Sequence, residues 1–258
     1  GSLGNLWRAY RLLRGLLLEH RPSLLILIDF PEFNLRLARV AKRHGIKVLY
    51  YISPQVWAWR PYRIRQIVAR VDAIAVVFPF EADLYRSQGM KDVVFVGHPL
   101  LDSVKPDQRR DATLEKVGLD HRKLTVVMMP GSRKTEVASL IRPMIEAANR
   151  LACERDVQFI LLRANTIELK ELEYAVATSS VTIRIVDGDT YNTLAAADIV
   201  WVASGTATLE AGLLQKPMVI TYRLSPVSYW LFRFFIRVNH IGMVNIVAGE
   251  RLVPELLQ

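Results

Sequence analysis

The chain has 258 residues, of which 51% are hydrophobic and 23% charged, and this composition suits a folded protein of one or two domains. Its net charge of +9 favours an anionic partner, which could be a nucleic acid, a phosphorylated substrate or an acidic membrane surface. A single cysteine, Cys153, excludes an internal disulfide and a cysteine-based zinc cluster, and suits a reducing cytoplasm. No apolar run reaches the roughly 18 residues of a membrane span, and no secretory signal pattern is present.

Apolar runs typical of strands alternate with helical patterns along almost the whole chain. We expect strands at 23–29, 46–52, 72–77 and 92–96, with helices at 31–44, 61–70 and 79–88 between them. A polar break at 102–107 is followed by strands at 124–129, 158–162, 181–186, 199–202 and 218–222. This alternation predicts an α/β protein with two parallel sheets and right-handed helical crossovers, divided into domains at 1–101 and 102–258.

Two candidate residues lie near strand ends in the first half. Asp29 ends the first predicted strand, where a carboxylate is well placed to take a proton from a substrate. Because Pro31 opens a helix, the spacing alone favours the alternative, in which Asp29 is the N-cap of that helix. His98 lies at the predicted domain junction, where a lone histidine more often has a structural role.

Residues 51–60, Tyr-Ile-Ser-Pro-Gln-Val-Trp-Ala-Trp-Arg, begin at the end of the second predicted strand and continue past it. This places them at the edge where α/β sheets bind ligands. Aromatic residues together with arginine favour a binding surface over the alternative, a buried aromatic corner.

Pro130-Gly131-Ser132-Arg133-Lys134 joins a predicted strand to a predicted helix. Glycine allows close approach of the backbone, and the first amides of a helix together with Arg133 and Lys134 attract phosphate. The spacing is not that of a Walker A loop. An ordinary turn with solvated basic residues explains the pattern equally well.

The stretch 204–210, Ser-Gly-Thr-Ala-Thr-Leu-Glu, repeats this arrangement after the strand at 199–202. Ser204 or Thr206 is suited to cap the next helix. Thr206 and Glu210 are four residues apart and share one helix face, so the Glu210 carboxylate is placed to accept hydrogen bonds from a ribose diol. The alternative is a solvated helix residue.

Two segments are amphipathic. Residues 6–18 place Leu6, Tyr10, Leu13 and Leu17 on one side, and residues 226–238 combine large aromatics with Arg233 and Arg237. Arginine with Trp and Phe on a short helix suits an anionic bilayer surface. The alternative for each is a core-packed helix that extends its arginines to solvent.

Taken together, these stretches resemble one family, the lipid-A-disaccharide synthases. The matching residues run in the family's order over essentially the whole chain, as Ile28-Asp29-Phe30-Pro31-Glu32-Phe33-Asn34, 51–60, Phe78-Pro79-Phe80-Glu81, Gly97-His98-Pro99, Pro130-Gly131-Ser132-Arg133 with Glu136, 203–210, Tyr222-Arg223, Asn245, Ala248-Gly249 and Pro254-Glu255-Leu256-Leu257-Gln258. As a set, they are far more specific than any one of them.

The resemblance implies an inverting glycosyltransferase of the GT-B type, with two Rossmann-like parallel-sheet domains facing a cleft. The N-terminal, acceptor-side domain (1–101) is incomplete here, and the C-terminal domain (102–258) binds the UDP-sugar. The implied reaction joins UDP-2,3-diacylglucosamine to 2,3-diacylglucosamine 1-phosphate (lipid X), which forms the β(1→6) lipid A disaccharide and releases UDP. It belongs to lipopolysaccharide synthesis in Gram-negative bacteria and needs neither a cofactor nor a metal.

The same resemblance implies roles for individual residues. Asp29 corresponds to the catalytic base. The nucleotide-sugar residues are Gly131, Ser132, Arg133, Ser204, Gly205, Thr206, Glu210 and Asn245. The acceptor and cleft residues are Ser53, Gln55, Trp57, Trp59, Arg60 and His98. The membrane contacts are Tyr229, Trp230, Arg233, Phe234 and Arg237, on an enzyme held peripherally at the cytoplasmic side of the inner membrane.

The chain departs from the family pattern at both ends. It has no Gly-Glu-x-Ser-Gly-Asp stretch and no helices after Gln258, so we expect an internal portion of a family member. Other UDP-sugar enzymes of the GT-B type, such as a UDP-N-acetylglucosamine epimerase or transferase, are the nearest alternative, and Trp57-Ala58-Trp59-Arg60 argues against them. Basic residues are too dispersed for a nucleic-acid-binding module. A membrane scaffold would not need the two phosphate-type turns.

Overall fold

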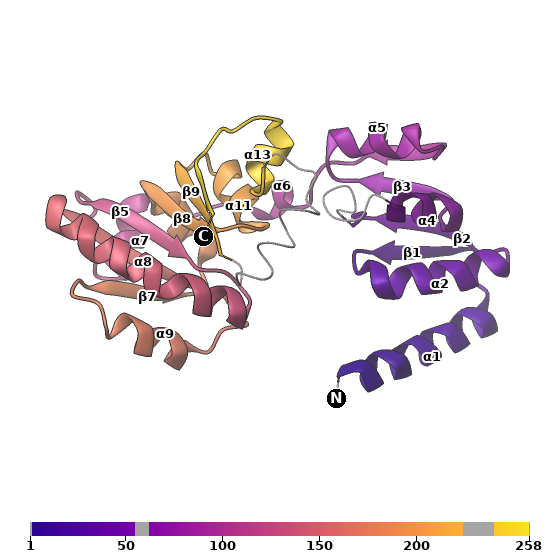
Figure 1. The fold of residues 1–258 in the computed structure, drawn as a ribbon, viewed down its shortest axis with the longest axis horizontal. Helices are drawn as coiled ribbons and strands as arrows, with labels where there is room; N and C mark the ends of the chain where they lie inside the picture. The colour runs from indigo at the N-terminus through magenta and orange to yellow at the C-terminus, as the bar shows by residue number, and fades with distance from the viewer. Residues whose placement is uncertain (1, 55–61, 224–239, 258) are drawn as a thin grey trace. The chain divides into compact units, whose positions relative to one another are not determined.

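The computed structural model describes residues 2–54, 62–223 and 240–257, and it divides the chain into two compact units, Gly1–Pro99 and Leu100–Gln258. Each unit has a parallel β-sheet with helices packed on it (Figure 1). The sequence predicted a division at 101/102, two residues from this point. Residues 55–61 and 224–239 lie outside the described part of the chain.

The first unit contains a four-stranded sheet in the order β1-β2-β3-β4. The strands are β1 (Leu24–Ile28), β2 (Lys47–Tyr51), β3 (Ala73–Val76) and β4 (Asp92–Phe95), and the helices are α1 (Ser2–His20), α2 (Pro31–Arg43), α4 (Tyr62–Arg70) and α5 (Pro79–Ser87). Every neighbouring pair of strands is parallel. The strand–helix alternation predicted for 23–96 is therefore confirmed in this unit.

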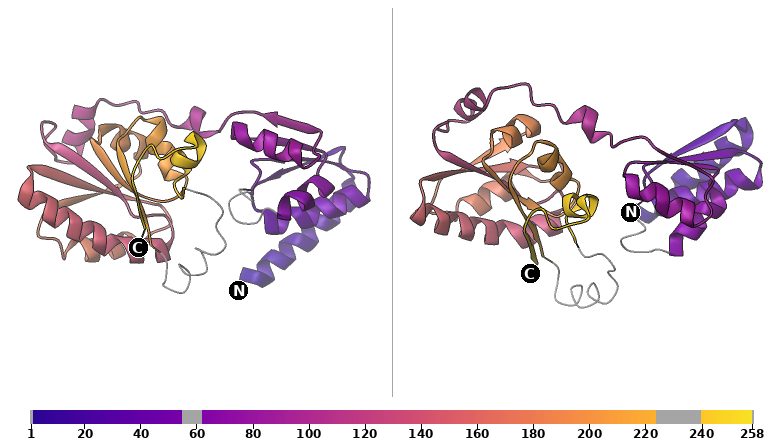
Figure 2. Two further views of the ribbon diagram at one scale, coloured as in Figure 1. Left: turned by 45° about the horizontal axis from the view of Figure 1, so that its top comes forward. Right: turned by 90° about the horizontal axis from the view of Figure 1, so that it is seen from above.

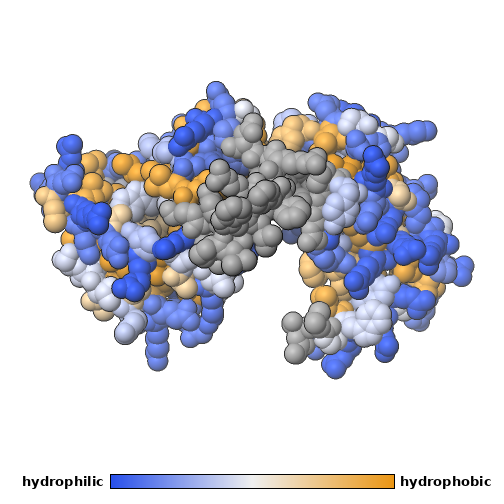
Figure 3. All heavy atoms as spheres, in the orientation of Figure 1, coloured by the Kyte–Doolittle hydropathy of each residue, from blue (hydrophilic) through white to orange (hydrophobic). Residues whose placement is uncertain are grey.

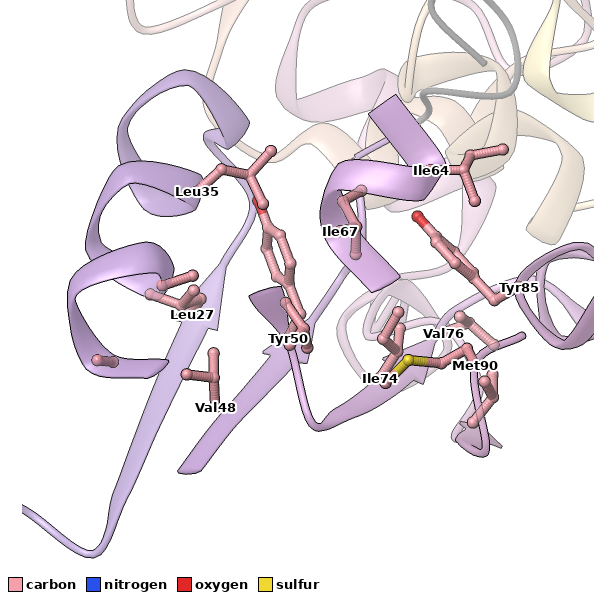
Figure 4. Close-up of a cluster of buried hydrophobic side chains, with 14 of the residues drawn as sticks. Leu27, Leu35, Val48, Tyr50, Ile64, Ile67, Ile74, Val76, Tyr85 and Met90 are labelled. Carbon is pink, nitrogen blue, oxygen red and sulfur yellow. The ribbon is translucent and has the colours of Figure 1, made fainter. Parts of the chain in front are cut away.

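The core of the first unit lies between one face of the sheet and its helices (Figure 4). Leu27, Val48, Tyr50, Ile74 and Val76 point into it because alternate residues of a strand share a face. On the opposite face the apolar residues of β1 remain exposed: these are Leu24, Ile26 and Ile28.

The second unit has a six-stranded parallel sheet in the order β10-β9-β8-β5-β6-β7. Its strands are β5 (Leu124–Met129), β6 (Val157–Arg163), β7 (Ile183–Asp187), β8 (Ile199–Ala203), β9 (Met218–Tyr222) and β10 (Glu255–Leu257). Its helices are α6 (Leu100–Ser103), α7 (Arg110–Lys116), α8 (Lys134–Glu154), α9 (Leu169–Val176), α10 (Thr190–Ala196), α11 (Ala207–Leu213) and α13 (Met243–Ala248).

Helices cover both faces of this second sheet, which the further views also show (Figure 2). Helices α8 and α9 close one core around Met128, Phe159 and Leu161. Helices α7, α10 and α11 close the other core around Val127 and Val200. The predicted α/β class with two parallel sheets is confirmed.

On the face seen in Figure 3, polar and charged side chains dominate, with smaller apolar patches between them.

Candidate functional site

The strand order of the second unit creates a natural binding position. The chain runs from β5 to β6 and β7 on one side, then returns to β8 on the other side of β5. In open α/β sheets, ligands bind beyond the carboxyl ends of the strands at such a reversal of order. The two glycine turns predicted from the sequence follow β5 and β8, so they flank this point.

A cavity of about 370 Å³ opens there. Of the eight residues that the family resemblance assigned to nucleotide-sugar binding, seven line it: Gly131, Ser132, Arg133, Ser204, Gly205, Thr206 and Glu210. The remaining wall includes Met129, Glu136, Leu162, Arg163, Ala164, Thr190, Ala203 and Ala207. The structure thus brings together residues that are up to 81 positions apart in the sequence, from Met129 to Glu210.

The turn after β5 is organised by Glu136 on the first turn of α8. Its Oε2 atom accepts hydrogen bonds from the backbone N–H of Ser132 and of Arg133, each at 3.3 Å. Its Oε1 atom accepts a hydrogen bond from the Arg133 guanidinium at 2.7 Å. The Arg133 side chain is nevertheless 79% exposed. The amides expected to attract phosphate are therefore already paired with a carboxylate, and the cations that line the cavity are Arg133, itself paired with Glu136, and Arg163.

Gly131 is required by this arrangement. Its φ of +120° is a conformation that residues with side chains rarely adopt, and a Cβ here would lie 2.7 Å from Oε2 and 2.8 Å from Cβ of Glu136. Gly205 also has a positive φ, +153°, but nothing lies near its missing Cβ. Gly131 is therefore needed both for its backbone conformation and for the close packing of Glu136, whereas Gly205 is needed only for its backbone conformation.

Glu210 also lines the cavity. Burial raises the pKa of the Glu210 carboxyl group. The Tyr191 hydroxyl donates a hydrogen bond to Glu210 Oε1 at 3.4 Å, and this hydrogen bond offsets part of the rise in pKa. Burial, and then the charge of Glu210, raises the pKa of Tyr191. Thr206 shares the cavity with Glu210, as their spacing predicted. A half-buried carboxylate with free acceptor positions can bind a diol.

The predicted capping of α11 by Ser204 or Thr206 is wrong. Thr206 is at the N-cap but has helical backbone angles and no side-chain cap. The Ser204 hydroxyl instead donates to the Ile241 carbonyl at 2.9 Å, which ties the turn to the segment before α13. Thr208 donates to the Gly205 carbonyl at 2.8 Å.

Asn245 does not join the cavity, contrary to its expected place with the nucleotide-sugar residues. It is fully buried. Its Nδ2 atom donates to the Val253 carbonyl and to Glu255 Oε1, at 2.9 and 2.8 Å, and its Oδ1 atom accepts from the Val253 N–H. Its hydrogen-bonding groups are thus used to fix the chain between α13 and β10. The sequence could not reveal these partners.

In the first unit Asp29 lies at the end of β1, as predicted, and it is exposed. The alternative role as N-cap of α2 is wrong, because the N-cap is Phe30 and has no side-chain cap. Asp29 and Phe30 both have positive φ angles, +46° and +40°. Such backbone strain in residues other than glycine is concentrated at functional sites.

The other expected acceptor residues divide into two groups. Ser53 is buried beside the hydroxyl of Tyr85 and does not face solvent. His98 is half-buried against the Phe78 ring at 5.5 Å, and burial lowers its pKa. Gln55, Trp57, Trp59 and Arg60 lie outside the described residues, as do Tyr229, Trp230, Arg233, Phe234 and Arg237.

Helix α1 matches its predicted amphipathic character only in part. Leu17 is buried in the core, but Leu6 and Leu13 are exposed. The Trp7 ring stacks on Tyr10 at 5.4 Å and lies 5.3 Å from the Arg11 guanidinium carbon. In the described part of the chain, no helix is both long and apolar enough to cross a bilayer. The described ranges also hold no cluster of three or more His, Cys, Asp or Glu residues suited to a metal ion.

Three charged or polar residues of the cavity were not predicted as site residues. Glu136 was recognised only as part of a matching stretch, while Arg163 and Thr190 were not singled out. Arg163 is the last residue of β6 and pairs with Asp187 at the end of β7, at 2.5 Å. A search for polar residues at every strand's carboxyl end would have found Arg163.

Comparison with known proteins gives consistent results. The family model described as lipid-A-disaccharide synthetase matches residues 1–258. The lipid-A-disaccharide synthase of Geobacter sulfurreducens is 47% identical over 99% of this chain, and that of Syntrophus aciditrophicus is 51% identical over 92%. The chain spans 67% and 62% of the length of these two curated relatives.

Among solved structures, the UDP-GlcNAc 2-epimerase of Methanocaldococcus jannaschii superimposes with a TM-score of 0.60. The match covers 98% of this chain and 70% of the epimerase, at 14% sequence identity. At that identity the likeness establishes the shared GT-B fold and does not extend to function.

Proposed function

The chain belongs to the lipid-A-disaccharide synthetase family, and on that basis we propose that it is the central part of a glycosyltransferase. The enzyme would join UDP-2,3-diacylglucosamine to 2,3-diacylglucosamine 1-phosphate and release UDP. The observation that carries the proposal is the convergence of Arg133 and Glu210 on one cavity at the strand-order reversal of the second unit. An epimerase shares the fold, but the 47% identity to a synthase favours disaccharide synthesis.

In this proposal the cavity of the second unit holds the donor. The exposed Arg133 guanidinium neutralises charge that develops on the departing diphosphate, which is the contribution expected from fixed cations in transfer reactions. Glu210 accepts hydrogen bonds from the ribose hydroxyls. Gly131 and Gly205 allow the backbone of both turns to approach the ligand closely.

Asp29 supplies the base. In an inverting transfer, the acceptor hydroxyl loses its proton as its oxygen attacks the anomeric carbon, and the bond to the UDP oxygen breaks. The exposed Asp29 carboxylate at the end of a parallel strand is suited to accept that proton. The inversion at carbon gives the β linkage in one step.

Lipid substrates also require access to a membrane surface, and we place the enzyme at the cytoplasmic side of the inner membrane. Helix α1 supports this placement, because Trp7, Leu12 and Leu16 are exposed on a helix that also carries arginines. The aromatic segment at 226–238 is the second candidate contact. The net charge of +9 favours an anionic bilayer over a neutral one.

The test is to incubate the full-length gene product with the two glycolipids and to assay disaccharide and UDP. Asp29→Asn should lower turnover by about 10²–10⁴-fold while UDP still raises the unfolding temperature as in the wild type. If the wild-type protein forms no disaccharide but interconverts UDP-sugars, the epimerase alternative replaces the proposal.

A further inference from the structure

The backbone around Asp29 is held in an unfavourable conformation. Asp29 and the following Phe30 both have left-handed φ angles. This region costs an ordinary residue such as Phe30 about 1–2 kcal/mol and an aspartate less, and two such residues in succession are uncommon. Surrounding contacts must therefore stabilise this turn.

Those contacts converge on one atom, the carbonyl oxygen of Asp29. The Asn34 side-chain amide donates a hydrogen bond to it at 2.7 Å, and the Tyr50 hydroxyl donates a second at 2.8 Å. A carbonyl oxygen has two lone pairs, and both are used here. The same Asn34 amide also donates to the Ile28 carbonyl at 2.9 Å. The peptide plane after Asp29 is thereby fixed, and with it the direction of the Cα–Cβ bond.

The two donors are themselves firmly held. Asn34 lies in the first turn of α2, where its backbone N–H donates to the Phe30 carbonyl at 3.0 Å. Tyr50 lies on β2 with its ring fully buried in the core of the first unit (Figure 4). Burial, and then the charge of Asp29, raises the pKa of the Tyr50 hydroxyl, so that it remains a donor over the physiological range. A site supported by packed elements keeps its geometry more accurately than a free loop does.

We propose that Asn34 and Tyr50 are positioning residues, which hold the Asp29 carboxylate in the orientation needed to take the acceptor proton. This inference rests on the proposed role of Asp29 as the base. Both side chains donate to the backbone carbonyl oxygen of Asp29, so each would act through Asp29. Replacing a positioning residue can move the catalytic group by about 1 Å, and a displacement of that size can lower the rate by about 10²-fold. The loss should therefore fall on kcat and leave KM for both substrates almost unchanged.

The experiment is a double-mutant cycle in the full-length gene product. Asn34→Asp keeps the shape of the side chain but removes both amide donors, and it should lower kcat by about 10–100-fold. Tyr50→Phe removes one donor and should cost about 3–10-fold. In an Asp29→Asn background, Asn34→Asp should lower the remaining rate by less than about twofold, because the base it positions is gone. Arg36→Ala, an exposed change on the same helix, is the matched control and should leave kcat unchanged.

Three outcomes would overturn the inference, and they are distinguishable. Wild-type kcat in Asn34→Asp would show that the two amide hydrogen bonds do not position the base. An equal fold-loss in the wild-type and Asp29→Asn backgrounds would show a general structural effect. Wild-type turnover in Asp29→Asn alone would remove the base assignment itself, and with it the premise, whatever Asn34 does.

Discussion

Replacing Gly131 with alanine tests the packing of the turn after β5. The new Cβ would have to adopt a φ of +120° and would lie 2.8 Å from the Cβ of Glu136, an atom close to the backbone that no side-chain rotation can move away. The backbone conformation costs about 1–2 kcal/mol. The overlap adds about 1–3 kcal/mol, as other overpacked sites do. We therefore expect Gly131→Ala to lower the free energy of unfolding of the second unit by about 2–5 kcal/mol.

Thermal and denaturant unfolding would measure this loss. For a domain of this size, 1 kcal/mol corresponds to about 2–4 °C in Tm, so the shift should be at least about 4 °C. Gly188→Ala is the matched control, because Gly188 has a φ of +72° and nothing lies near its missing Cβ. Gly188→Ala should lower the free energy of unfolding only by the cost of the backbone conformation, about 1–2 kcal/mol. Equal losses in the two variants would refute the steric reasoning.

Further changes in the second unit separate binding from stability. Because burial raises the pKa of Glu210, its charged form is lost at a higher pH than for an ordinary glutamate, and UDP-sugar affinity should fall as pH decreases through that raised pKa. Glu210→Gln should lower the affinity for the UDP-sugar at pH 7.5 by about 10-fold or more and remove this pH dependence. Calorimetric titration at several pH values would measure both effects. A pH profile that is unchanged in Glu210→Gln would contradict the proposed contact of Glu210 with the ribose. Arg133→Ala should weaken UDP binding by about 10-fold or more but leave uridine binding within about twofold, and equal losses for both ligands would argue against a diphosphate contact. Asn245→Ala should cost about 2–3 kcal/mol of stability, because it leaves buried partners around Val253 and Glu255 unpaired, while UDP affinity measured under folded conditions stays the same. A specific loss of UDP affinity in that variant would restore Asn245 to the nucleotide site.

Much of the fold could be predicted from the sequence, because strands and helices carry local patterns. The strand expected at 124–129 is β5, and those expected at 199–202 and 218–222 match β8 and β9 to within one residue. The short strand β10 and helix α13 were missed. A strand of three residues has too few positions for its alternation to be recognised, and β10 forms only because β9 offers it a parallel partner.

The candidate site was predicted to the extent that it depends on glycine turns at strand ends. Parallel strands bring their carboxyl ends to one edge, so the turns at Gly131 and Gly205 were expected to meet, and they do. The same reasoning placed Asp29 at the end of β1. Strand order was not predictable from these patterns, and it is the adjacency of β5 and β8 that puts Arg133 and Glu210 in one cavity.

The two α/β units, the positions of most strands and the residues at their carboxyl ends were all predictable, because they follow from patterns that span a few residues. The partners of the polar side chains became known from the folded structure. It buried Asn245 against Val253 and turned the Glu136 carboxylate back onto the amides of its own turn. It also joined Asn34 and Tyr50 at one carbonyl oxygen. A hydrogen bond depends on distances of a few tenths of an ångström between groups from different elements, and packing alone sets those distances.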